Sequence, residues 1–244
     1  MPSSTEEQWP WKQPVCPVTR GAFIVIEGLD RAGKTTQVKR LCDKLYLLGL
    51  NVKTLRFPDR ASPIGLMINN YLQNLTHMDD HAIHLLFSAN RWERANWIKE
   101  NINAGYTIVC DRYHLSGVAY SVGKNNPSLT KEWALASDIG LPCPDAIIFL
   151  DISPEDASVR AEFGTEKYEK KEFQQQIRKI FLHLLDSISN DTLVRIIDAG
   201  QPVLTVESQI FATISDTVDS IISGLFKKQI KMVLPLREKN DIIQ

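Results

Sequence analysis

The sequence lacks the patterns that mark metal centres, disulfide scaffolds and membrane spans. Its four cysteines form no C-x-x-C pair and have no histidine cluster beside them. Zinc and disulfide sites are therefore disfavoured, and a reducing compartment is expected. No apolar run approaches the roughly 20 residues of a membrane helix. The net charge of −1 provides no global basic field for nucleic acid or an anionic membrane, so we expect neither partner.

Targeting signals are also missing. Residues 1–20 contain Glu6, Glu7 and several prolines but no apolar stretch, which is unlike a secretory signal or an Arg-rich transit peptide. We expect a poorly ordered extension there and a cytoplasmic address, with the nucleus as an alternative. The 244 residues, 43% hydrophobic and 23% charged, suit one large globular domain or a domain with insertions.

Short apolar, β-branched runs alternate with helical patterns along the chain. The expected strands are Ala22–Glu27, Asn51–Phe57, Tyr106–Cys110, Ala146–Leu150 and Val194–Ile197. Helical periodicity follows the first run, a long helix is expected over Asp79–Asn103, and Pro154 opens another helix. About five strands alternating with helices predict an α/β fold with a parallel sheet. In such sheets a ligand lies beyond the carboxyl ends of the strands.

The stretch EGLDRAGKTT, residues 27–36, follows the first expected strand and opens the first expected helix. It matches G-x-x-x-x-G-K-[ST], a loop whose backbone N–H groups hold phosphate. Gly28 and Gly33 permit the tight turn, Lys34 reaches the β and γ phosphates, and the Thr35 hydroxyl can ligate Mg²⁺. A chance glycine loop is the alternative, but the strand before it and the helix after it favour nucleotide binding.

Asp111 ends the YTIVC run, as expected of a carboxylate that holds Mg²⁺ directly or through water. Arg112 beside it indicates a nearby anion.

The sequence has neither N-K-x-D for guanine nor the dinucleotide fingerprint G-x-G-x-x-G. A kinase that holds two anionic nucleotides needs more arginines than a protein that binds only ATP. The arginines at expected strand ends or on adjacent helices are Arg31, Arg56, Arg60, Arg91, Arg112 and Arg160. Each alone is more simply a solvated surface charge.

The motifs EGLDRAGKTTQ, LRFPDR, HLLFSANRWE, CDRYHLSGVAY, GLPCPD and FGTEKYE stand in this order. In this the chain resembles thymidylate kinases of the eukaryotic type, over about Arg20 to Ile222. The resemblance implies a P-loop nucleoside monophosphate kinase fold, with five parallel strands wrapped by helices. It places the kinase domain at residues 21–222, a mobile lid at about 160–172 and a tail at 223–244. It also implies a homodimer.

The implied reaction is phosphorylation of dTMP to dTDP with Mg-ATP, in dTTP synthesis for DNA replication. The resemblance assigns ATP to Gly28, Arg31, Ala32, Gly33, Lys34, Thr35, Thr36, Arg160 and Gly200, and Mg²⁺ to Thr35 and Asp111. It assigns dTMP to Asp30, Phe57, Arg60, Phe87, Arg91, Arg112, Ser116, Gly117, Tyr120, Ser121 and Tyr168. The expected catalytic residues are Arg31, Lys34 and Arg112.

A carboxylate inside a phosphate loop would repel a phosphate, which makes Asp30 the odd residue of the motif. The resemblance resolves this, because it implies that Asp30 accepts a hydrogen bond from the deoxyribose 3′-OH. It also implies that Phe87 stacks on thymine, that Arg91 bonds its O4 carbonyl, and that Tyr120 crowds the 2′ position. From pattern alone Phe87 is more simply a core aromatic, and Tyr120 is equally explained by packing.

One family branch carries a catalytic arginine in the phosphate loop, and the other carries it in the lid. Here the loop has Arg31, whereas residues 161–171 contain lysines, Lys167 among them, and no arginine. A lysine cannot bind phosphate through two parallel hydrogen bonds, so the resemblance favours Arg31 as the catalytic arginine.

Two alternatives remain open. One is a relaxed kinase that also accepts dUMP or dGMP, and the other is a nucleotide-binding regulator without turnover. His81, His84 and His114 belong to no motif, and we expect surface or capping roles for them. No histidine base is assigned, since phosphoryl transfer depends on positioning and charge.

Overall fold

Five parallel strands form the central sheet, as predicted. They are β1 (Phe23–Gly28), β2 (Val52–Arg56), β3 (Thr107–Asp111), β4 (Ala146–Asp151) and β5 (Leu193–Asp198). Their order across the sheet is β2-β3-β1-β4-β5. The computed structural model describes residues 20–160, 167–188, 192–226 and 229–235. The expected N-terminal extension, except Arg20, and residues 161–166 of the expected lid lie outside the described residues.

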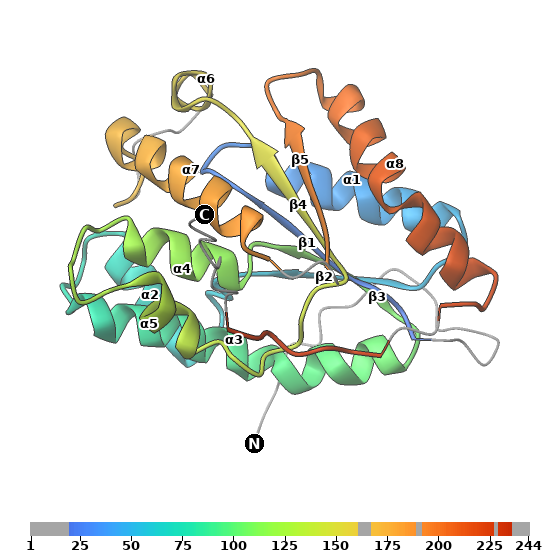
Figure 1. The fold of residues 1–244 in the computed structure, drawn as a ribbon, viewed down its shortest axis with the longest axis horizontal. Coiled ribbons are helices and arrows are strands. Elements are labelled where there is room, and N and C mark those ends of the chain that lie inside the picture. Colours follow the sequence, from blue (N-terminus) through green and yellow to red (C-terminus); the bar gives the residue numbers. More distant parts are fainter. Residues whose placement is uncertain (1–19, 161–166, 189–191, 227–228, 236–244) are drawn as a thin grey trace, which may run out of the picture.

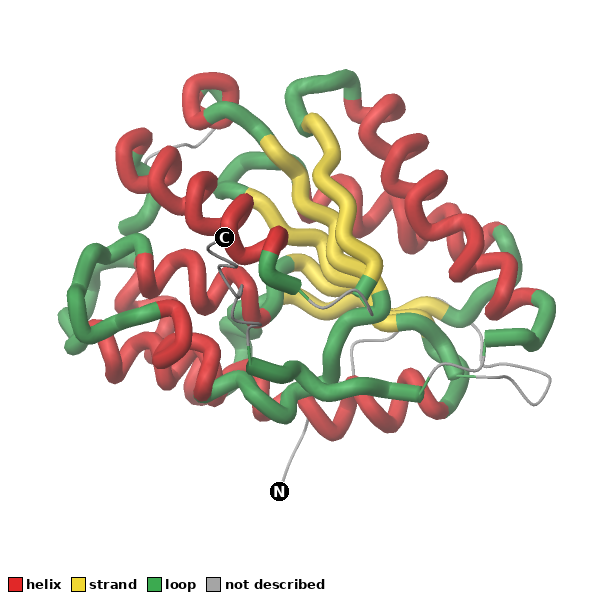
Figure 2. Tube along the Cα trace, viewed as in Figure 1, coloured by secondary structure: helices red, strands yellow, loops and turns green. Residues whose placement is uncertain are grey.

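Helices connect the strands and cover both faces of the sheet (Figures 1 and 2). They are α1 (Lys34–Leu47), α2 (Pro63–Leu72), α3 (Asp80–Asn103), α4 (His114–Val122), α5 (Lys131–Ala136), α6 (Pro154–Ser158), α7 (Lys171–Asp186) and α8 (Val203–Ile222). Helices α1 and α8 pack together on one face, whereas α3, α4 and α7 lie on the other. Among the described helices, none has the length and apolarity that crossing a membrane requires.

Helix starts follow the local sequence. Ser62 caps α2 by accepting a hydrogen bond from the Gly65 N–H, and Pro63 follows it in the first turn. Asp79 caps α3 through the N–H groups of His81 and Ala82. A capping side chain satisfies donors that the first helical turn leaves free. The predicted start of this helix at Asp79 is therefore its cap.

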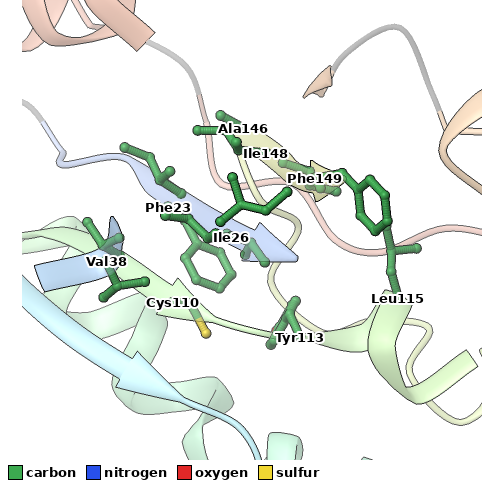
Figure 3. Close-up of a cluster of buried hydrophobic side chains, with 14 of the residues drawn as sticks. Phe23, Ile26, Val38, Cys110, Tyr113, Leu115, Ala146, Ile148 and Phe149 are labelled. Carbon is green, nitrogen blue, oxygen red and sulfur yellow. The ribbon is translucent and has the colours of Figure 1, made fainter. Parts of the chain in front are cut away.

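The core forms around strand β1, which is buried along its whole length. Figure 3 shows Phe23 and Ile26 of β1 beside Ile148 and Phe149 of β4, with Tyr113 close by. The Phe23 and Tyr113 rings meet edge to face, with centroids 5.1 Å apart. Burial on both faces explains why the sequences of β1, β3 and β4 are almost continuously apolar and do not alternate.

Parallel pairing brings the carboxyl ends of the strands to one edge of the sheet. Asp111 at the end of β3 is in register with Ile26 of β1 and with Arg56 of β2. The phosphate loop leaves β1 at the same edge, so the charged residues that follow each strand converge there, as the sequence predicts.

The C-terminal segment differs from the appended tail that the sequence suggested. Phe226 and Val233 are buried. Residues 231–233 pair with the loop after α5: the Val233 N–H donates to the Leu141 carbonyl at 2.8 Å, and the Gly140 N–H donates to the Val233 carbonyl at 3.0 Å. In Figure 1 this red segment runs beside α3, so the packed body of the protein extends beyond residue 222.

Candidate active site

The phosphate loop holds three residues with positive φ. They are Gly28 at 152°, Arg31 at 64° and Gly33 at 90°. A Cβ on Gly28 would lie 2.7 Å from the Leu150 carbonyl oxygen, so backbone packing requires the first glycine. Arg31 adopts a conformation that is uncommon for a residue with a side chain, and such strain concentrates at functional sites.

Lys34 is buried, and its ammonium group donates to the Leu29 carbonyl at 2.5 Å. Burial, together with the nearby Arg112 charge, lowers the pKa of Lys34 to about 7 against the opposing effect of Asp111. A buried cation with too little compensating charge is prepared to receive an anion.

The side chains of Thr35 and Asp111 are in direct contact. The Thr35 hydroxyl donates to Asp111 Oδ2 at 2.6 Å, and the Asp111 side chain is buried. Asp111 Oδ1 is buried without a hydrogen-bond partner among the described residues. A carboxylate oxygen in that state is costly unless a cation or water reaches it. The pair therefore fits Mg²⁺, although the described residues contain no group of three or more acidic, histidine or cysteine side chains around a metal position.

Asp30 faces three polar side chains from later segments of the chain. It forms an ion pair with Arg112, accepts a hydrogen bond from the Tyr120 hydroxyl at 3.0 Å, and accepts another from Gln174 Nε2 at 2.8 Å. Burial alone would raise the pKa of Asp30, but the charges of Arg112 and Lys34 outweigh it and lower the pKa overall. Asp30 is thus an ionised hydrogen-bond acceptor.

Arg112 is held at the centre of the site. Its φ is 68°, and its Nη1 donates to the Gly28 carbonyl at 2.9 Å and to the Ser116 hydroxyl at 3.3 Å. Beneath it, the buried Glu27 accepts hydrogen bonds from the Ser116 hydroxyl at 2.5 Å and from the Tyr113 N–H at 2.9 Å. Burial raises the pKa of Glu27 despite these bonds. This layer fixes Arg112 from below, so its guanidinium group is oriented before a ligand binds.

Arg31 and Arg160 connect the phosphate loop to later segments. Arg31 Nε donates to Glu169 Oε1 at 3.0 Å. Arg160 donates from Nη1 to the Arg31 carbonyl at 2.7 Å and from Nη2 to the Ala199 carbonyl at 2.8 Å. Arg160 therefore links the phosphate loop to the segment that follows β5.

The aromatic side of the site lies between α3, α4 and the start of α7. Phe87 is half-buried, and the Tyr168 hydroxyl donates to the Tyr71 hydroxyl at 3.3 Å. The Tyr168 ring stacks on Phe173. The Lys167 ammonium lies 3.8 Å from the Tyr71 ring centroid.

One cavity of about 2330 Å³ brings most of these residues together. Ligand pockets of about 300–1,000 Å³ hold one small molecule, so this cavity has room for two nucleotides. Of the expected site residues, Gly28 and Gly200 do not line it. The others do: Asp30, Arg31, Ala32, Gly33, Lys34, Thr35, Thr36, Phe57, Arg60, Phe87, Arg91, Asp111, Arg112, Ser116, Gly117, Tyr120, Ser121, Arg160 and Tyr168.

The expected surface roles of two histidines are wrong. His84 and His114 are buried, and burial lowers the pKa of each to about 4. His84 Nδ1 lies 2.7 Å from the Ser121 hydroxyl. Tertiary packing buries both side chains, and His84 also lines the cavity; single-sequence periodicity did not reveal this. His81 lies beside the capping Asp79, as expected.

Two residues that hold the loop, Glu169 and Gln174, are absent from the residues predicted from sequence. Gln174 contacts Asp30 twice, since its Oε1 also accepts from the Asp30 N–H at 3.2 Å. Glu169 ends the FGTEKYE motif, so the motif itself was a usable signal. Gln174 carries no comparable signal, because its contact spans 144 positions of the chain.

Comparison with known proteins agrees with this geometry. The sequence profile described as thymidylate kinase matches residues 26–210. The chain belongs to the thymidylate kinase family. It is therefore classed with the nucleoside monophosphate kinases, and the family's reaction is phosphorylation of dTMP to dTDP.

Individual relatives span most of the chain. The thymidylate kinase of Dictyostelium discoideum is 46% identical over 212 residues, which are 86% of this chain and 89% of that protein. The human thymidylate kinase is 42% identical over 201 residues, covering 82% and 92% respectively. The solved structure of the Candida albicans thymidylate kinase superposes with a TM-score of 0.78 at 38% identity, and covers 88% of this chain and 99% of that chain.

Proposed function

We propose that this chain transfers the γ-phosphoryl group of ATP to dTMP and forms dTDP and ADP. Family membership supports the reaction. The main observation behind the assignment of roles is that the phosphate loop contains both a basic and an acidic side chain, which face different neighbours. Lys34 is a buried amine with a lowered pKa that gains full charge beside a phosphate, whereas Asp30, four residues earlier, is an ionised acceptor turned toward Tyr120 and Arg112.

On the donor side, the backbone from Ala32 to Thr36 and the Lys34 ammonium bind the β and γ phosphates. Arg160 and the Ala199–Gln201 loop flank the adenine. Thr35 and Asp111 hold Mg²⁺, which offsets phosphate charge when it is bound.

On the acceptor side, Asp30 accepts a hydrogen bond from the 3′-OH. Arg60 and Arg112 bind the monophosphate, and Phe87 and Arg91 contact thymine. Arg31 lies between the two sides. When its guanidinium group releases Glu169, it stabilises the phosphoryl group as that group is transferred.

The reaction needs no general base. A monophosphate with a second pKa near 6 is mostly a dianion at neutral pH, so its oxygen attacks the γ phosphorus directly while the bond to the β-phosphate oxygen breaks. His84 and His114 are neutral and buried, which is consistent with structural roles. Catalysis then rests on positioning and on charge.

The test is product analysis. Purified protein with Mg-ATP is offered dTMP, dUMP, dGMP, UMP, CMP and AMP separately, and nucleotides are resolved by ion-exchange chromatography. We expect dTDP to form much faster than any ribonucleoside diphosphate. Equal turnover of CMP would contradict the assignment, and ATP binding without dTDP formation would favour a regulator. The panel includes dUMP and dGMP because the Candida albicans thymidylate kinase is described as having broad substrate specificity.

We also propose a homodimer. Large apolar side chains are exposed on α2 and α3, among them Leu66, Leu85 and Trp92, which are 56%, 48% and 42% exposed. Sedimentation equilibrium tests this, with a dimer mass expected and a monomer mass contradicting it. A cytoplasmic or nuclear address stays a prediction.

A further inference from the structure

We propose that Asp138 is a positioning residue that holds Arg91 in the orientation that recognises the pyrimidine of the acceptor. The inference rests on the proposed function, in which Arg91 contacts thymine. Asp138 belongs to no motif and lies just after α5, 47 positions from Arg91.

The two side chains form a buried pair with two parallel hydrogen bonds. Arg91 Nε donates to Asp138 Oδ1 at 2.9 Å, and Nη2 donates to Oδ2 at 2.7 Å. The side chains are 2% and 0% exposed. Two parallel bonds fix the plane of a guanidinium group, which one bond does not.

This geometry leaves the far edge of the Arg91 guanidinium group for a ligand. Nε and Nη2 are used by Asp138, and Arg91 makes no other side-chain hydrogen bond within the part of the chain that the structure describes. Arg91 nevertheless lines the cavity. Both N–H groups of Nη1 and the second N–H of Nη2 therefore remain as donors for a carbonyl oxygen of the base.

Gly117 of α4 limits rotation of the Arg91 guanidinium group. A Cβ at Gly117 would lie 2.6 Å from Arg91 Nη2 and 2.9 Å from Nη1. The guanidinium group thus packs against the bare backbone of α4. It cannot rotate about the Asp138 contact without leaving that surface.

Asp138 is itself anchored to α3. The Ser88 hydroxyl contacts Asp138 Oδ1 at 2.8 Å and the Ser137 carbonyl at 2.9 Å. Trp92 Nε1 donates to the same Ser137 carbonyl at 2.8 Å. The carboxylate and its neighbour are thus held by the same helix that carries Arg91.

A buried ion pair is weak evidence for stability, because desolvation offsets much of the attraction. The clearer benefit of this pair is that it orients the Arg91 side chain before the ligand binds. A free arginine side chain loses much rotamer freedom when a ligand fixes it, and prior orientation avoids that loss. A fixed N–H donor favours the carbonyl at thymine C4 over the amino group of cytosine, since two donors would face each other.

The experiment compares Asp138→Asn with wild type in steady-state kinetics and in calorimetric binding of dTMP. We expect the KM and Kd of dTMP to rise about ten-fold or more, as loss of a charged hydrogen-bond partner implies. The KM of ATP should stay within about two-fold, and the preference for dTMP over dCMP should fall about ten-fold.

Asp145→Asn is the matched control. Asp145 also binds an arginine through both carboxylate oxygens: Arg20 Nη2 at 2.6 Å and Nη1 at 2.9 Å. It lies outside the cavity lining, where β4 begins, and its carboxylate also accepts from the Phe23 N–H. This variant should lose thermal stability without a change in the KM of dTMP. If Asp138→Asn does the same, Asp138 is merely structural and the inference is wrong.

A second comparison remains usable if Asp138→Asn folds poorly. Ser88→Ala removes only one contact of Asp138, and we expect it to raise the KM of dTMP about two- to three-fold with ATP unaffected. In an Arg91→Gln background the same Ser88 change should have no effect on dTMP, because it acts through Arg91. Equal effects in both backgrounds would overturn the proposal.

Wild-type protein that binds dTMP without making dTDP would refute the kinase assignment alone, whereas absent dTMP binding would refute both.

Discussion

Binding of ATP should take up a proton, because Lys34 is only partly charged at neutral pH in the ligand-free protein. Burial lowers the pKa of Lys34 to about 7, with Arg112 adding to the effect and Asp111, Asp30 and Glu27 opposing it. Polyphosphate brings negative charge to the ammonium, which restores the charged form in the complex.

The size of the effect follows from the pKa. At pH 8 a group with a pKa of about 7 is only about 10% protonated, so binding should take up about 0.9 proton per ATP. At pH 6 the group is already about 90% protonated, and the uptake should fall to about 0.1. The apparent affinity for ATP should therefore weaken as the pH rises above about 7, by up to about ten-fold per pH unit.

Isothermal titration calorimetry in two buffers with different ionisation enthalpies measures this uptake. Lys34→Arg is the matched control, since arginine keeps its charge and should take up no proton. The buried His84 and His114 contribute little, because their pKa of about 4 leaves them neutral throughout this range. Zero uptake by the wild type at pH 8 would show that Lys34 is already charged, and the desolvation argument would fail.

Two further predictions concern Arg31 and the C-terminal segment. Arg31→Ala should lower kcat by about 10³-fold with a modest change in the KM of dTMP, because its contact forms mainly in the transition state; a rise in KM alone, in rapid-quench and steady-state assays, would make it a binding residue. Truncation after residue 224 removes the buried Phe226 and Val233, together with the stacking of Arg20 on Phe226, and should cost on the order of 3–5 kcal/mol. Truncation after residue 235 is the control; equal melting temperatures for the two would contradict the packing described for residues 229–235.

The sheet and the phosphate loop are the parts that sequence predicts well. β1 and β3 are buried runs of six and five residues, and Gly28, Gly33 and Lys34 lie close together in the chain. Their structure depends on neighbours in sequence, so local patterns are sufficient. The strand-end rule then places Asp111 and Arg112 at the ligand edge without further information.

Contacts between distant segments are what the sequence does not reveal. Asp138 looks like an ordinary loop acid until the fold brings it to Arg91. The burial of His84 and the pairing of Val233 with Leu141 likewise depend on tertiary packing. The long helix α3 has polar and apolar residues on all sides, because different faces contact the sheet, α2 and the cavity. Its periodicity therefore gives no clear buried face.

The central claim is that one loop serves two ligands, with Lys34 on the donor and Asp30 on the sugar of the acceptor. The most direct test measures kcat/KM for dTMP and for its 3′-deoxy analogue, in wild type and in Asp30→Asn, at saturating ATP. We predict that wild type prefers dTMP by about 10²-fold, as for a charged hydrogen bond of about 1.5–3 kcal/mol. Asp30→Asn should lose most of that preference while the KM of ATP stays unchanged. An equal preference in both proteins would show that Asp30 does not face the 3′-OH, and would contradict the account.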